Sequence, residues 1–135
     1  MGVALPAGHP LAAADNLDLA DLAEEPWVLT PRSSWEPWHR QYDRDFAAAG
    51  FSPNVVHRGT SVQSLLALVA AGIGVTRLPL SARTLRDTGV VFVPLRNEYA
   101  DVVIAWLDDR PRPAVEALRD VIHATARNSD LLNAG

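Results

Sequence analysis

The fold of this chain is decided by the stretch LALVAAGIGVTRLP, residues Leu66 to Pro79. Its first six residues are apolar on nearly all sides, which predicts a buried helix. Gly72 is placed where a helix is expected to stop. The residues from Gly74 to Pro79 predict a short strand closed by proline. A buried helix that leads directly into a strand is a typical unit of α/β proteins.

Strands and helices alternate along the rest of the chain. Two helix starts carry capping-box patterns, Ser33 with Glu36 and Thr60 with Gln63. The alternation, with several strands that are apolar throughout, predicts an α/β fold whose mainly parallel sheet is flanked by helices. Strands are expected over residues 2–6, 26–31, 54–58, 74–79, 89–95 and 101–107, and helices over 17–22, 33–49, 60–71, 80–85 and 112–127.

Composition narrows the function classes. The 135 residues suit one domain of ordinary size, and 48% hydrophobic with 21% charged residues is a globular composition. The formal charge of −4 argues against nucleic-acid binding by this chain alone. There is no cysteine and no lysine, which excludes disulfides, thiolate zinc sites and Schiff-base chemistry. No apolar run is long enough to cross a bilayer, so we expect no membrane partner and a cytoplasmic location.

Catalytic and metal-binding patterns are weak. The four histidines are His9, His39, His57 and His123, and none stands in a metal-ligand spacing. Ser33 or Ser61 with His57 could be imagined in a triad, but no GxSxG elbow is present. We therefore predict no catalytic residues, no metal and no cofactor.

Gly72 and Gly74 resemble half of a dinucleotide fingerprint. They follow a helix and precede a strand, which is the wrong order for phosphate binding. The favoured interpretation is a helix cap with tight packing.

Two polar helix starts are more informative, one over residues 30–34 and one over residues 58–61. Ligands of open α/β sheets gather at the carboxyl ends of strands, where helix N-termini suit an anion. Arg32 and Arg58 could add charge-assisted hydrogen bonds. The alternative, equally supported by the residues, is that these side chains only cap helices. Trp35 and Trp38 are candidates for the floor of a pocket for an apolar ligand, with core packing as the alternative for Trp38.

The order of these motifs resembles the effector-binding domain of LysR-type transcriptional regulators. Ala4 to Leu11 followed by Leu19 to Leu22 resembles the opening of the second subdomain, and Pro26 to Leu29 resembles its next strand. Leu66 to Val75, with Leu78 and Pro79, is similar to the family's helix, Gly-x-Gly turn and strand. The resemblance implies a periplasmic-binding-protein type II-like fold, in which two subdomains clamp a small molecule such as a carboxylic acid or an aromatic metabolite.

The resemblance also implies a division of the chain. Residues 7–95 match the second subdomain, residues 96–127 match the strand and helix that return to the first, and residues 128–135 form a tail. The family's winged helix-turn-helix, through which such regulators contact DNA, has no counterpart here, so we expect a fragment. An apolar face formed by Val115, Leu118, Val121 and Ile122 would then need another cover, and a homo-oligomer is expected.

The resemblance assigns cleft-lining roles to residues at both helix starts. They are Pro31, Arg32, Ser33, Ser34, Gly59, Thr60 and Ser61, with Thr76 as an additional candidate. The predicted function is therefore effector sensing by a LysR-type regulator. A free-standing solute-binding protein of the same fold and a small α/β enzyme are the alternatives.

Overall fold

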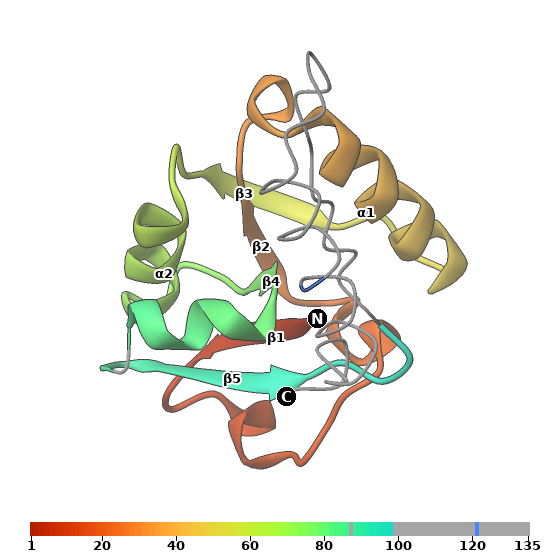
Figure 1. Ribbon diagram of the computed structural model, residues 1–135. Coiled ribbons are helices and arrows are strands. Elements are labelled where there is room, and N and C mark those ends of the chain that lie inside the picture. Colours follow the sequence, from red (N-terminus) through yellow and green to blue (C-terminus); the bar gives the residue numbers. More distant parts are fainter. Residues whose placement is uncertain (87, 99–120, 122–135) are drawn as a thin grey trace. The chain divides into compact units, whose positions relative to one another are not determined.

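A computed structural model describes residues 1–86, 88–98 and 121. The chain divides into two compact units, Met1–Glu98 and Tyr99–Gly135, and every described residue except Val121 belongs to the first. The strands of this unit are β1 Gly2–Pro6, β2 Pro26–Leu29, β3 Asn54–Arg58, β4 Thr76–Leu78 and β5 Val90–Pro94. Its α-helices are α1 Glu36–Ala48 and α2 Val62–Ala70, and short 3-10 turns cover Pro10–Ala13, Leu19–Leu22, Arg32–Ser34 and Leu80–Leu85 (Figure 1).

The first strand of the chain is the centre of a three-stranded sheet with the order β4-β1-β5. β1 is antiparallel to both neighbours, with Gly2 opposite Leu78 of β4 and opposite Pro94 of β5. Val3, Ala4 and Leu5 are completely buried because the strand is paired on both edges and covered by other elements. Residues near the N-terminus thus form part of the core.

A second sheet joins β2 and β3 in parallel. Trp27 also forms an isolated parallel bridge with Val75, just before β4. The amide of Val28 donates to the carbonyl of Val75 over 2.9 Å, and the amide of Val75 donates to the carbonyl of Pro26 over 2.8 Å. These bonds place the first residues of β2 beside Val75, the residue before β4.

The predicted alternation of strands and helices is confirmed, but the strand directions are only partly as expected. The pairing of β2 with β3 is parallel, whereas both pairings of β1 are antiparallel. Hydrophobic periodicity reports which faces of a segment are buried and carries no information about the direction of its neighbour. The antiparallel sheet around β1 is therefore a feature of the tertiary structure.

The Gly-x-Gly turn has the two roles expected of it. Gly72 has φ of +77°. Its amide donates to the carbonyl of Val69, and the amide of Ile73 donates to the carbonyl of Leu68, which is the bonding pattern of a Schellman cap. A Cβ on Gly74 would lie 2.6 Å from the carbonyl oxygen of Pro26, so this position has room only for glycine. The turn serves helix termination and close packing.

Both predicted capping boxes are wrong in position. α1 begins at Glu36 after a Trp35 cap that has no side-chain hydrogen bond, because residues 32–34 form a separate 3-10 turn. α2 begins at Val62, and its capping box is formed by Ser61 and Ser64. Ser61 has extended backbone angles, with φ of −143° and ψ of 164°, so the helix starts one residue later than the Thr60 pattern predicts.

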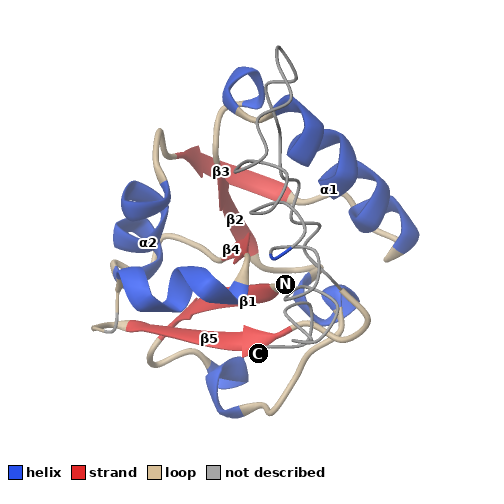
Figure 2. Ribbon diagram, in the orientation of Figure 1, coloured by secondary structure: helices blue, strands red, loops and turns tan. Residues whose placement is uncertain are grey.

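One face of α2 closes a hydrophobic core. Leu65, Leu66 and Val69 are buried against the sheets, while Ala67 on the opposite face is exposed. The helix is thus covered on one side and not on all sides. Figure 2 shows α2 and the Leu80–Leu85 turn on one side of β1, with α1 on the far side of β2 and β3.

The predicted strand over residues 101–107 and tail over residues 128–135 lie outside the described residues, as does the helix over 112–127 except for Val121, which is 60% exposed. The proposed boundary between subdomains near residue 95 stays a prediction. Among the described residues, no helix combines the length and the apolar character needed to cross a membrane.

Candidate functional site

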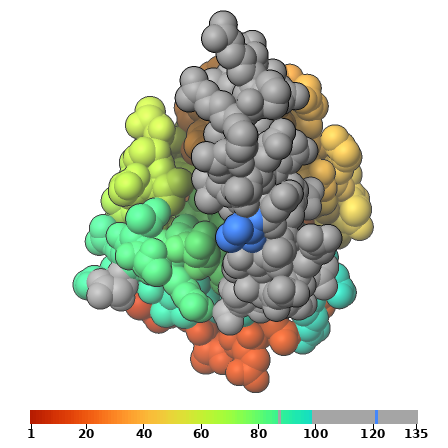
Figure 3. All heavy atoms as spheres, viewed as in Figure 1, coloured from red at the N-terminus to blue at the C-terminus, as the bar shows by residue number. Residues whose placement is uncertain are grey.

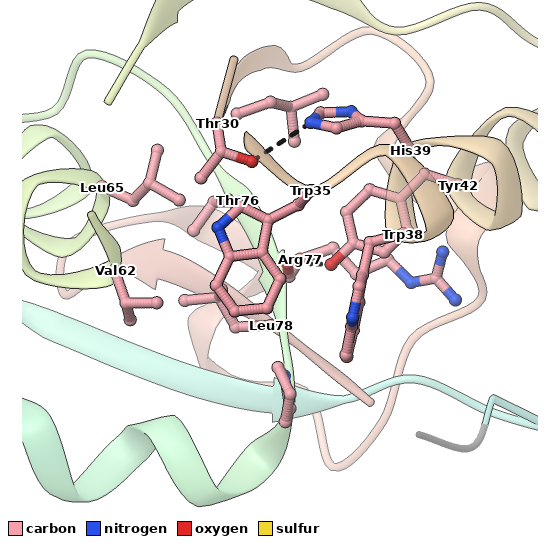
Figure 4. A pocket seen from close by; sticks show the side chains of 12 residues that line it. Thr30, Trp35, Trp38, His39, Tyr42, Val62, Leu65, Thr76, Arg77 and Leu78 are labelled. Atoms are coloured by element: carbon pink, nitrogen blue, oxygen red, sulfur yellow. Dashed lines mark hydrogen bonds between the residues drawn. The ribbon is translucent and has the colours of Figure 1, made fainter. Parts of the chain in front are cut away.

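A cavity of about 190 Å³ opens where β2 and β4 end and where α1 and α2 begin. β2 and the residue after it contribute one wall, and β4 with the following proline contributes the floor. The two helices contribute the sides, as Figure 4 shows. The lining residues are Leu29, Thr30, Trp35, Trp38, His39, Tyr42, Val62, Leu65, Thr76, Arg77, Leu78 and Pro79.

Aromatic rings form the α1 side of the cavity. Trp38 and Tyr42 are four residues apart in α1, which places them on one face of the helix, and Trp35 is the residue directly before it. Trp35 and Trp38 meet edge to face with centroids 6.3 Å apart, and Trp38 meets Tyr42 in the same way at 6.0 Å. Trp35 is 50% exposed, so this wall remains open to solvent. In the view of Figure 3, the atoms of α2 (yellow-green) lie on the left and those of α1 (gold) lie on the right.

His39 is a buried polar group of the lining, 4% exposed. Its Nε2 lies 3.1 Å from Oγ1 of Thr30 at the end of β2. Burial lowers the pKa of His39, and the positive charges of Arg32 and Arg58 lower it further. The imidazole is therefore neutral near pH 7, and it offers hydrogen bonding without charge.

Tyr42 has its hydroxyl group committed to the fold. The hydroxyl donates to the backbone carbonyl of Arg77 over 2.7 Å. Burial raises the pKa of Tyr42 far above its ordinary value. The phenol stays protonated at every physiological pH, and its ring, not its hydroxyl, is what a ligand would meet.

Arg77 lies at the centre of a buried charge cluster. Its Nη2 is 2.7 Å from Oδ2 of Asp45, and its Nε is 2.7 Å from Oε2 of Glu98. The guanidinium carbon lies 4.6 Å from the centroid of the Tyr42 ring. Burial raises the pKa of Glu98, and the charge of Arg77 opposes that effect. Two carboxylates thus compensate one buried cation.

Thr76 is the residue with a predicted cleft-lining role that lines the cavity. It is completely buried, and its Oγ1 has no hydrogen-bond partner among the described residues. A buried hydroxyl without a partner is uncommon and carries a free-energy cost. Thr76 is therefore a polar group that a ligand could satisfy.

The other predicted site residues surround the cavity without lining it. Arg32 makes a bidentate pair with Asp43 at 2.8–2.9 Å, and Ser33 and Ser34 are exposed. Pro31 is half-buried directly after the lining residue Thr30.

The second predicted segment ends directly before the lining residue Val62. Thr60 is exposed, and Ser61 caps α2. Gly59 is buried, and a Cβ there would lie 2.8 Å from Oγ of Ser64. These residues lie next to the candidate cavity, and their ligand-binding role stays a prediction.

Trp35 and Trp38, the candidates for the floor of a pocket, both line the cavity. Several other lining residues were not predicted, although the spacing of Trp38 and Tyr42 indicates one face of a helix. No sequence signal marks Arg77, because its partners Asp45 and Glu98 come from distant parts of the chain. Among the described residues, His, Asp and Glu side chains do not gather in groups of three that could hold a metal ion.

Comparison with known proteins identifies the family. Residues 1–127 match the model of the LysR substrate binding domain. The HTH-type transcriptional regulator AlsR of Bacillus subtilis is 32% identical over 116 residues, a match that covers 84% of this chain and 38% of AlsR.

Solved structures agree with this match. The BenM effector binding domain with its effector benzoate is 30% identical with a TM-score of 0.60, covering 71% of this chain and 44% of that one. Full-length BenM is 26% identical with a TM-score of 0.70, covering 94% and 44%. The chain thus spans less than half the length of these relatives. Its match to the family model over nearly all of its length shows that the chain belongs to the LysR substrate-binding domain family.

Proposed function

We propose that this chain is the effector-sensing part of a LysR-type transcriptional regulator and that its ligand occupies the cavity between α1 and α2. The observation that carries the proposal is the cavity itself, which is aromatic and apolar with a few buried polar groups. Small-molecule sites combine these properties, and in α/β folds they lie at the carboxyl ends of strands. The solved BenM domain, a relative of this chain, holds an effector, benzoate.

The size of the cavity points to a small ligand. Its volume of about 190 Å³ lies below the roughly 300 Å³ at the lower end of drug-sized sites. One or two fused rings are a reasonable occupant. In the longer protein, a second surface would cover the open side near Trp35.

The role in regulation follows from linkage. A ligand that binds one arrangement of the regulator better than another shifts the population toward that arrangement. We propose that the change reaches DNA through a winged helix-turn-helix that this sequence does not contain, in a cytoplasmic homo-oligomer. The function proposed for this chain is binding and not catalysis.

A thermal-shift screen against small aromatic and carboxylic compounds tests the proposal. A ligand of the folded state raises the melting temperature as its concentration exceeds its Kd. Trp35→Ala removes an exposed aromatic wall and should abolish the shift. Leu85→Ala, at a site equally exposed but outside the lining, should retain it. If no compound produces a shift, or if both variants retain it, the proposal is wrong.

The same screen tests the predicted residues at the helix starts. Arg32→Ala and Thr60→Ala should reduce the shift if the ligand reaches these segments. If both variants bind as the parent chain does, Arg32 has the structural role that its pair with Asp43 indicates, and Thr60 has no role in binding.

A further inference from the structure

Among the described residues, every charged group around the cavity is paired with an opposite charge or turned to solvent. We infer that the ligand is an uncharged aromatic molecule and not a carboxylate. The inference rests on the proposed function, because it names the chemical class of the ligand. It depends on three lining residues that can ionise, on two arginines at the rim and on the rings of α1.

The lining presents its ionisable side chains without net positive charge. His39 is a neutral imidazole that lies within hydrogen-bond distance of Thr30. Tyr42 is a protonated phenol whose hydroxyl is already bonded to a backbone carbonyl. Neither residue can pair with the charge of a carboxylate.

Arg77 has its charge directed away from the ligand. Asp45 and Glu98 both lie 2.7 Å from its guanidinium. Figure 4 shows the guanidinium behind the ring of Tyr42, on the side away from Val62 and Leu65. A third carboxylate at this end would meet a cation that two negative charges already compensate, so it would gain no unpaired positive charge.

The arginines at the rim are already engaged. Arg32 is paired with Asp43 through a bidentate contact. Arg58 donates to the backbone carbonyl of Thr30 over 2.8 Å and is exposed to solvent, where water and salt screen its charge. The N-terminus of α2 adds a partial positive charge near Val62. The two arginines and the helix N-terminus therefore do not offset the free energy of hydration that a carboxylate loses in an apolar cavity.

The polar groups inside the cavity suit a neutral partner. The pair formed by Thr30 and His39 and the unpartnered hydroxyl of Thr76 can exchange hydrogen bonds with an amide, a hydroxyl or a carbonyl group. The edge-to-face arrangement of Trp35, Trp38 and Tyr42 provides ring surfaces that favour another aromatic ring. An uncharged ring with one hydrogen-bonding substituent satisfies both features.

Titration of the full chain with matched pairs of compounds tests this inference. Benzamide is compared with benzoate, and indole-3-acetamide with indole-3-acetate, at pH 7.5 by isothermal titration calorimetry. The members of each pair share size and ring and differ in charge. Each amide should bind about tenfold or more tightly than its carboxylate, because the carboxylate loses its hydration without gaining a cation.

A charge added to the lining should reverse this preference. Val62 lines the cavity at the first position of α2, and Val62→Lys places an ammonium there. Gln63→Lys adds the same charge at the next residue, which is exposed and outside the lining. Val62→Lys should shift the ratio of the two Kd values toward the carboxylate by about tenfold, while Gln63→Lys should leave the ratio nearly unchanged.

The outcomes separate this inference from the proposed function. If the carboxylates bind as tightly as the amides or more tightly to the parent chain, the inference is wrong and the binding function stands. If Val62→Lys leaves the ratio unchanged, charge in the lining does not control selectivity, and the inference is again wrong. If no member of either pair binds, both the inference and the proposed binding site are overturned.

Discussion

Three glycine-to-alanine substitutions would measure how the Gly-x-Gly turn holds the fold together. At Gly74 a Cβ would lie 2.6 Å from the carbonyl oxygen of Pro26 and 3.1 Å from its carbonyl carbon. Both atoms belong to the backbone, so the strain cannot be relieved by rotating a side chain. The same carbonyl accepts the hydrogen bond from Val75 that ties β4 to β2, and movement of either segment would weaken that bond.

The expected cost of Gly74→Ala follows from these contacts. Overpacking costs about 1–3 kcal/mol, and a weakened hydrogen bond adds about 1 kcal/mol. We therefore expect a loss of about 2–4 kcal/mol in the free energy of unfolding. For a chain of this size, that corresponds to a fall in Tm of roughly 6–20 °C.

Gly72 and Gly8 provide graded controls. A Cβ on Gly72 meets open space, but its φ of +77° disfavours any other residue, so Gly72→Ala should cost about 1 kcal/mol. A Cβ on Gly8 also meets nothing within 4 Å, and no left-handed angle is required there. Gly8→Ala should leave stability within about 0.5 kcal/mol of the parent chain.

Urea unfolding followed by far-ultraviolet circular dichroism measures all three variants at one protein concentration. The expected order of destabilisation is Gly74→Ala, then Gly72→Ala, then Gly8→Ala. If Gly74→Ala is as stable as the parent chain, or if Gly72→Ala is the more damaging change, the reasoning from close backbone packing is refuted.

Three further predictions concern the cap of α2, the buried histidine and the charge cluster. Ser61→Ala should lower the free energy of unfolding by about 1 kcal/mol, while Thr60→Ala should change it by less than about 0.5 kcal/mol. If chemical denaturation gives the two variants equal losses in this free energy, the cap at Ser61 is contradicted. Folding lowers the pKa of His39 from its ordinary 6.5, so the unfolded state binds more protons and the free energy of unfolding should fall as pH drops below about 6.5. In a pH series of denaturation curves, His39→Gln should weaken the dependence of this free energy on pH between pH 7 and 5. The same dependence in His39→Gln as in the parent chain would count against a buried neutral imidazole. Arg77→Met leaves the carboxylates of Asp45 and Glu98 without a cation and should lower the free energy of unfolding by about 3–5 kcal/mol. A loss below about 1 kcal/mol by calorimetry would show that the cluster contributes little to stability.

Much of the fold of the first unit was predictable because the signals are local. The end of α2 at Gly72 follows from the left-handed angle that glycine adopts readily. The 3-10 turn Leu80–Leu85 and the strand β5 lie where residue patterns predicted a short helix and a strand. The alignment of Trp38 and Tyr42 on one face of α1 follows from helical periodicity.

The two cap predictions failed for one physical reason. The cap was wrong by two residues for α1 and by one for α2, because several polar residues near each helix start could serve as the cap. Pro37 permits a start at more than one nearby position, and only the backbone angles of Trp35 and Ser61 decide the boundary. The lining of the cavity begins just beside the predicted segments 30–34 and 58–61, and the ligand-binding role of those segments stays a prediction.

The sequence by itself determined the order of strands and helices, the two roles of the glycines in the turn and the resemblance to the LysR family. Each depends on residues that are close neighbours in the chain or on a pattern of such neighbours. Only the tertiary structure decided that β1 pairs antiparallel on both edges and that Arg77 meets Asp45 and Glu98. These contacts join segments far apart in the sequence, and their geometry depends on how the whole core packs, which no local pattern encodes.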